Sequence, residues 1–119
     1  MAITINSSPV EVSGPVVELM LEDNGSAHVS FTLFIEGVTP IPLQWDETFM
    51  GTKTFTLPIA PGEYKCDIMI GAFNTNNALG PVYKSKITLN GLEFASTKGK
   101  LAKKNSGEFG FTTQSFKVI

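Results

Sequence analysis

The fold is decided by one stretch of this sequence, Ile59-Ala60-Pro61-Gly62-Glu63-Tyr64-Lys65-Cys66-Asp67-Ile68-Met69-Ile70-Gly71-Ala72-Phe73-Asn74. It opens with Pro61-Gly62, a pair that favours a tight turn because Pro presets φ and Gly tolerates a positive φ. Apolar residues then occupy every second position over Tyr64–Ala72, which is the period of a strand that buries one face. Met69 and Phe73 fall on the opposite face, which indicates a strand covered on both sides. The stretch predicts a turn followed by the longest strand of a β protein.

The other strands are predicted from the same alternation. Asp23–Ser26 and Asn90–Gly91 each contain Asn-Gly, which favours a type I′ hairpin turn because both residues adopt positive φ easily. Helix signals are confined to Lys98–Lys104, where Gly99 opposes them. The last strand is Phe-rich and is expected to bend near Thr113. We expect an all-β chain of about eight strands, at residues 16–22, 27–36, 43–47, 53–59, 62–73, 82–89, 92–95 and 107–119.

Composition limits the classes of function. The 119 residues form one domain with room for a hydrophobic core. The chain contains no Arg and has a sequence pI of about 5.3, which argues against a nucleic-acid reader. Cys66 is the only cysteine, so neither an internal disulfide nor a metal-binding cysteine cluster is expected, and no cofactor is implied. We see neither a signal peptide nor a membrane-length apolar run, and expect a virion or cytoplasmic location.

Charge is distributed unevenly along the chain. Residues 1–50 hold seven acids and no lysine, a sum of −7, whereas residues 51–119 hold nine lysines and four acids, a sum of +5. If the two halves interleave in one sandwich, the asymmetry averages out. If they do not, a dipolar surface favours head-to-tail contact between copies or neighbours.

Pro61-Gly62-Glu63-Tyr64, followed by alternating apolar residues, resembles the tyrosine corner at the entry to strand F of immunoglobulin-like domains. Tyr64-Lys65-Cys66 keeps the Tyr-x-Cys spacing of those domains. The continuation through Gly80-Pro81 to residues 85–89 is similar to the F–G hairpin of fibronectin type III modules. The resemblance covers residues 57–89. It implies an antiparallel β-sandwich in which the Tyr64 hydroxyl bonds a backbone group just upstream, so that Pro61, Gly62 and Tyr64 are structural.

The resemblance also suggests how the chain is divided. Residues 1–15 are expected to form an N-terminal arm or edge strand, and residues 16–91 the immunoglobulin-like β-sandwich. Residues 92–119 exceed the module and are expected to form a C-terminal β extension that packs on the same domain or on a neighbour.

Candidate catalytic residues are few. His28 shares a strand face with Ser30, but no acid is placed to orient the ring, so a solvent-facing strand histidine is the simpler interpretation. Cys66 falls on the apolar face of its strand, as expected of an inert core thiol. Glu22-Asp23-Asn24 lacks the spaced ligands of a calcium loop and is interpreted as a turn. We expect no catalytic, metal or cofactor site.

Two features remain as possible binding sites. Trp45 with Phe49 could form an aromatic platform for a sugar or peptide, or Trp45 could be a core anchor. The loop after the longest strand carries Asn74, Asn76 and Asn77, which suit recognition or a tolerated polar loop equally well.

The leading functional hypothesis is a non-enzymatic structural or assembly protein, such as a small bacteriophage tail, baseplate or capsid-decorating component of a virion. Its partners would be proteins, including copies of itself, and its terminal strands would add to a neighbour's sheet edge. A carbohydrate- or peptide-binding module is the first alternative. An intracellular inhibitor or adaptor of a host protein is the second.

Overall fold

The structure is a computed structural model. It describes residues 1–5, 10–13, 16–36, 41–45, 51–57, 59–74, 80–102 and 106–119, and within 41–45 it describes the backbone alone.

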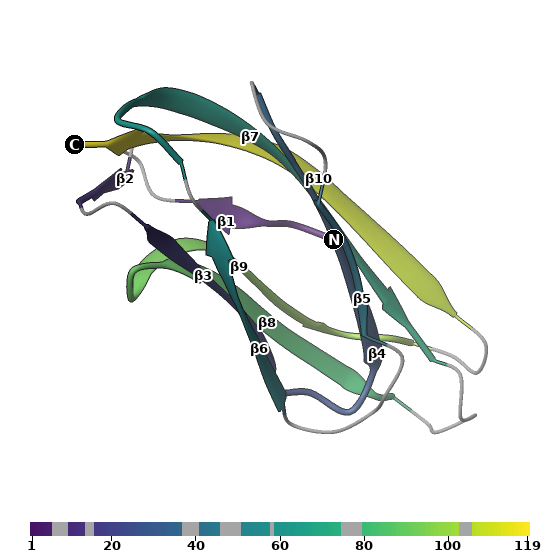
Figure 1. Ribbon diagram of the computed structural model, residues 1–119. Helices are drawn as coiled ribbons and strands as arrows, with labels where there is room; N and C mark the ends of the chain where they lie inside the picture. The colour runs from purple at the N-terminus through teal and green to yellow at the C-terminus, as the bar shows by residue number, and fades with distance from the viewer. Residues whose placement is uncertain are drawn as a thin grey trace.

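The described residues form two stacked β-sheets and no helix, so the expected all-β sandwich is confirmed (Figure 1). Sheet A has the strand order β1-β9-β8-β3-β6, and sheet B has the order β2-β10-β7-β4-β5. The strands are β1 (Thr4–Ile5), β2 (Val10–Val12), β3 (Val17–Asp23), β4 (His28–Ile35), β5 (Ile41–Trp45), β6 (Gly51–Leu57), β7 (Gly62–Phe73), β8 (Val82–Leu89), β9 (Leu92–Lys100) and β10 (Gly107–Val118).

The core lies between the sheets and is built from the alternation seen in the sequence. β3, β4 and β7 turn every second residue inward, and those inward side chains are buried. Phe94 of β9 and Phe116 of β10 meet edge-to-face between the sheets, with ring centroids 5.8 Å apart. Tyr83 of β8 also bridges the sheets, because its hydroxyl donates a 2.6 Å hydrogen bond to the Glu108 carboxylate on β10.

The predicted hairpin at Asp23–Ser26 is wrong. β3 belongs to sheet A and β4 to sheet B, so this segment crosses between the sheets instead of joining two paired strands. Gly25 allows the crossing because a Cβ there would collide with the backbone oxygen of Val82. Asn24 and Ser26 donate backbone hydrogen bonds to Lys84 and Val82, which hold the segment against β8. Asn-Gly serves close approach here rather than a type I′ turn.

The predicted hairpin between residues 62–73 and 82–89 is also wrong. β7 lies in sheet B between β10 and β4, whereas β8 lies in sheet A between β9 and β3. β8 instead forms the second predicted hairpin, with β9. Its turn has positive φ at both residues, 49° at Asn90 and 80° at Gly91, as a type I′ turn requires.

Both ends of the chain join the same two sheets. β1 pairs with β9 at the edge of sheet A and crosses the side of the sandwich, while β2 runs parallel to the end of β10 (Figure 1). β9 continues to Lys100, past the predicted end of that strand, with a register shift at Ile87/Thr88 where it pairs with β8. Residues 92–119 therefore supply one inner strand to each sheet.

The acidic and basic halves of the sequence interleave. Sheet A places β3 of the acidic half between β8 and β6 of the basic half, and β1 of the acidic half beside β9 of the basic half. Glu22 and Lys86, which face each other across β3 and β8, form a 3.5 Å ion pair. The arrangement matches the interpretation in which the asymmetry averages out.

Candidate functional site

The tyrosine corner is present as a structural device. The Tyr64 hydroxyl donates a 2.7 Å hydrogen bond to the backbone oxygen of Ala60, four residues upstream, and the ring stacks on Phe116 at 5.3 Å. Gly62 takes a φ of 155°, which L side chains rarely adopt. The Tyr64 hydroxyl thus ties the start of β7 to the crossover from β6, in the way that the resemblance implied.

The predicted binding residues are only partly described. Trp45 ends β5, with its backbone opposite Val29 of β4, and its side chain lies outside the described residues, as do Phe49, Asn76 and Asn77. Asn74 is described and is buried, with 3% of its surface exposed. Its N–H donates a 2.9 Å hydrogen bond to the backbone oxygen of Ser106, which ties the end of β7 to the start of β10. Asn74 therefore lies inside the fold, at the junction of β7 and β10.

Cys66 is a core thiol, as expected. It is buried on the inner face of β7, and burial, assisted by the nearby Asp67 charge, raises its pKa to about 12. A nucleophilic cysteine needs a lowered pKa. The thiol at Cys66 is therefore protonated at neutral pH and unsuited to attack.

Asp23 was predicted to lie in a turn; it is the last residue of β3 and is fully buried. Its Oδ1 accepts a 3.1 Å hydrogen bond from the Gly25 N–H. Its Oδ2 has no partner among the described residues, and the buried Ser85 hydroxyl on the adjacent strand likewise has none there. Desolvation raises the pKa of Asp23 to about 6, although the Gly25 hydrogen bond opposes the rise.

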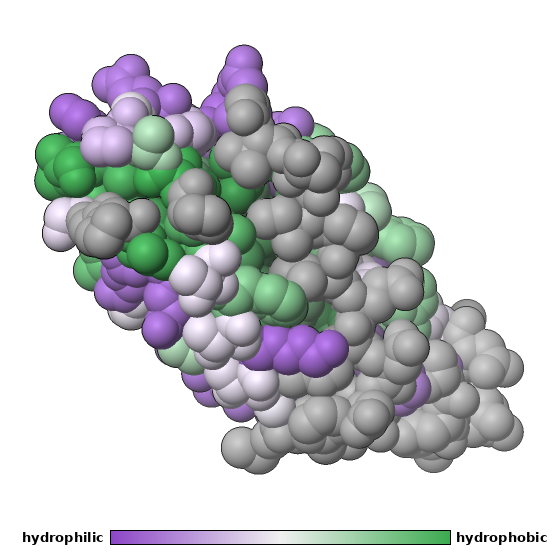
Figure 2. Space-filling view, in the orientation of Figure 1, coloured by the Kyte–Doolittle hydropathy of each residue, from purple (hydrophilic) through white to green (hydrophobic). Residues whose placement is uncertain are grey.

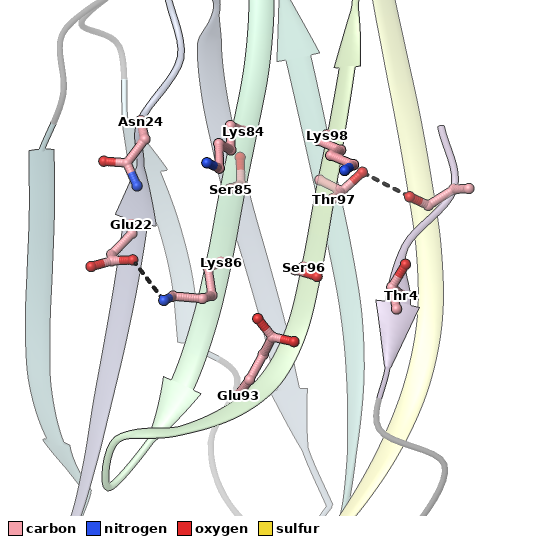
Figure 3. A pocket seen from close by; sticks show the side chains of 11 residues that line it. Thr4, Glu22, Asn24, Lys84, Ser85, Lys86, Glu93, Ser96, Thr97 and Lys98 are labelled. Atoms are coloured by element: carbon pink, nitrogen blue, oxygen red, sulfur yellow. Dashed lines mark hydrogen bonds and ion pairs between the residues drawn. The ribbon is translucent and has the colours of Figure 1, made fainter.

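A polar hollow of about 640 Å³ lies on sheet A between β1, β9, β8 and β3 (Figure 3). Glu22 and Lys86 form an ion pair at one side, and the Thr97 hydroxyl donates to the Ala2 backbone oxygen at the other. Lys84 and Lys98 lie directly opposite each other in the register. The hollow is open to solvent and is lined by long polar side chains. The described contacts do not point several polar groups at one position where a ligand could bind.

The outer face of sheet B carries a group of exposed apolar side chains that includes the two most exposed phenylalanines of the described residues, and we call this set the apolar face. Phe109 and Phe111 of β10 are 63% and 70% exposed, and Phe34 of β4 and Met69 of β7 are 46% and 40% exposed. Phe73 packs edge-to-face on Phe109, with centroids 5.5 Å apart. The set is Phe34, Met69, Phe73, Phe109 and Phe111.

Strand register makes the apolar face contiguous. Phe111 pairs with Met69, and Phe109 is next along β10, opposite Gly71. A Cβ at Gly71 would lie 3.0 Å from the Phe73 ring, so the glycine lets that ring lie flat across β7 toward Phe109. Figure 2 shows a small hydrophobic area at the right-hand edge of the molecule, beside the first part of β10, and a larger one near the C-terminal end.

The sequence pattern predicted that Met69 and Phe73 would be covered. It did not assign the β10 phenylalanines to the inner or the outer face of their sheet. The signal that could have assigned them is the switch from odd-numbered to even-numbered apolar positions along the strand. Phe109 and Phe111 occupy odd positions, whereas Phe116 and Val118 occupy even ones. β10 pairs with β7 in one unbroken register, with no bulge near Thr113, so only one of these pairs can point inward.

Comparison with known proteins gives no relative: no family model, no curated protein and no solved structure matches this chain. Within the described segments, no three His, Cys, Asp or Glu side chains gather as a metal site would require. No helix in the described part of the chain is long and apolar enough to cross a membrane.

Proposed function

We propose that this chain is a non-enzymatic structural or assembly protein that binds another protein through the apolar face of sheet B. The observation that carries the proposal is the grouping of Met69, Phe73, Phe109 and Phe111 on one sheet surface, with Phe34 on the same face of the next strand, opposite Asp67. Scattered exposed apolar residues are normal on a protein surface, but a contiguous cluster marks a site of association.

The size of the exposed groups supports a protein partner. Aromatic and Met side chains are the types enriched at protein interfaces, where a rigid ring buries a large area with little loss of entropy. The charged groups nearest the cluster are few: Asp67 is held by a 2.9 Å hydrogen bond from the Thr113 hydroxyl. A partner that covers the face would leave that carboxylate with a hydrogen-bond donor.

The rigid backbone beneath the cluster also supports binding. β7 pairs along its whole length with β10 and over eight positions with β4. The apolar face is thus displayed by three continuous strands, which hold its side chains in one arrangement before a partner arrives.

We infer an immunoglobulin-like architecture for the sandwich. Sheet B, read β5-β4-β7-β10, has the order of strands C′, C, F and G, and the tyrosine corner stands at the start of the F-like strand. The β8–β9 hairpin departs from that pattern. It lies between the F-like strand β7 and the G-like strand β10 in the sequence, but it belongs to sheet A.

The other functional hypotheses stay predictions. A sugar or peptide platform at Trp45 and Phe49 depends on side chains outside the described residues. An inhibitor or adaptor would use the same apolar face against a single host protein. A virion is the setting we favour for an assembly protein, and it too remains a prediction.

Methionine footprinting tests the proposal. Met69 lies on the apolar face, and Met20 lies on the opposite outer surface, in β3 of sheet A, where it serves as an internal control. Hydroxyl radicals should oxidise Met69 readily in the purified chain and at least fivefold more slowly in the native assembly taken from the cells that produce it. Met20 should change little. Equal Met69 oxidation in both samples would refute the proposal.

A further inference from the structure

The backbone groups of β10 point alternately toward β7 and away from it. In an antiparallel strand, successive residues point their N–H and C=O to opposite sides. The Ile119 N–H donates to Val12 on the β2 side of the strand. The Ser115 N–H donates to the side-chain oxygen of its neighbour Gln114 and not to β7. Lys65, which lies opposite Ser115 on β7, accepts a backbone hydrogen bond from Glu36 on the β4 side, so its carbonyl points away from β10. The odd-numbered residues of β10 therefore point their backbone groups away from β7.

β2 covers only the end of that side. It pairs with Phe116, Lys117 and Val118, and no other described strand pairs with β10 there. Among the described residues, therefore, no strand covers the N–H and C=O groups of Phe109, Phe111 and Thr113. Two of these residues are also the most exposed aromatics of the apolar face.

This edge lacks the protection that the other edges have. Natural sheets blunt their edges with lysine, proline or very short strands. β6 carries Lys53, β5 carries Pro42, and β1 and β2 have two and three residues. In contrast, the outward positions of β10 from residue 107 to 115 are Gly, Phe, Phe, Thr and Ser, with no charge among them.

We propose that the β10 edge pairs with the β10 edge of a second copy of this chain, antiparallel and about a two-fold axis at Phe111. This rests on the proposed assembly function and adds a contact between copies at the β10 edge, beside the apolar face. The pairing sets Phe111 opposite its own copy and Phe109 opposite Thr113. Three residues of each copy then exchange about six backbone hydrogen bonds, and the two B sheets become one continuous sheet.

Self-pairing is favoured because the edge is complementary to itself. An isologous interface must tolerate each residue facing its symmetry mate, and an uncharged, aromatic centre meets that condition where a lysine or acid would not. On the inner side, Gly110 would face Thr112 of the second copy, and both are small. Met1 and Ile3 pack beneath Gly110, about 3.0 Å from where its Cβ would lie, and continue the apolar layer under the seam.

The seam is small, so the dimer should be weak. Strand pairing plus the flanking aromatics would bury roughly 800–1,000 Å² in total, at the low end for specific interfaces. We expect a dissociation constant on the order of 10 μM, measured by sedimentation velocity from 1 to 500 μM.

Two lysine variants separate edge pairing from stacking of apolar faces. Phe111→Lys places two like charges on the two-fold axis and should weaken the dimer roughly 30-fold or more, which is about 2 kcal/mol. Phe34→Lys adds the same charge to the same face, but on β4, two strands from the edge, and should change the constant less than about threefold. Circular dichroism checks that both variants fold. Equal weakening by both would overturn edge pairing.

Amide hydrogen exchange gives a second measurement, in which the even-numbered residues of β10 serve as the control for the odd-numbered ones. The N–H groups of Phe109, Phe111 and Thr113 should exchange slowly at high concentration and quickly at low concentration or in Phe111→Lys. Those of Gly110 and Thr112 face β7 and should be protected throughout. Concentration-independent exchange at the three odd positions would refute the pairing.

The outcomes separate the inference from the proposed function. A chain that stays monomeric at 500 μM, yet whose Met69 is protected in the native assembly, overturns self-pairing and leaves the assembly function standing with another partner. A monomer whose Met69 is equally exposed in both settings overturns both.

Discussion

Replacing Asp23 with Asn should stabilise the protein at neutral pH and leave it nearly unchanged in acid. The folded carboxyl has a pKa of about 6 because it is desolvated, against a model value of 3.8. Between these values the folded chain holds a proton that the unfolded chain releases, so stability falls as pH rises through this window. The fall is complete above the folded pKa.

The magnitude follows from the two pKa values. A difference of about 2 pKa units corresponds to about 3 kcal/mol at pH 7.5, and to a melting temperature roughly 10 °C higher for the variant. Asn keeps the side-chain oxygen that accepts from the Gly25 N–H, and its amide adds a donor on the strand beside Ser85, whose hydroxyl has no partner among the described residues.

Urea denaturation of both proteins at half-unit steps from pH 4 to pH 8 measures the effect. The difference in free energy of unfolding should grow with pH and level off near pH 7. Asp23→Ala is the control: it also removes the buried charge but loses the Gly25 hydrogen bond, so its curve should have the shape of the Asn curve and lie about 1 kcal/mol lower. Wild-type and Asn curves that stay parallel across this range would refute the reasoning.

Three further predictions test the architecture. Tyr64→Phe should cost about 1 kcal/mol of stability, because it removes the hydrogen bond to the Ala60 oxygen and keeps the ring; an unchanged urea midpoint would contradict a corner role. Gly99→Ala should cost about 1–3 kcal/mol, because the new Cβ would overlap the Tyr83 hydroxyl, and thermal melts will show it. Cys66 should react with an aromatic disulfide reagent in urea but at least about 100-fold more slowly in buffer, since it is buried and its pKa is raised to about 12.

Local alternation predicted the strands and the core faces, but not how the strands distribute between the sheets. The inward positions of β3, β4 and β7 agree with the sequence pattern because burial of one face imposes period two on any half-buried strand. The same pattern holds whether the next strand pairs beside it or crosses the core. Asn24-Gly25 and Asn90-Gly91 show the limit: identical dipeptides form a sheet-to-sheet crossing and a type I′ hairpin, and long-range contacts decide between them.

The apolar face shows a second limit on what the sequence alone could predict. Its phenylalanines were visible in the sequence, and their parity relative to Phe116 contained the information about which side they take. With a bulge near Thr113, all four apolar residues of β10 could have pointed into the core. The unbroken pairing with β7 excludes that, and the Phe116 ring already fills the core between Tyr64 and Phe94. Phe109 and Phe111 are therefore kept outside by the register of the strand that carries them. A strand that holds two exposed phenylalanines at an unprotected edge has the features of a contact surface, and its backbone geometry indicates another β10.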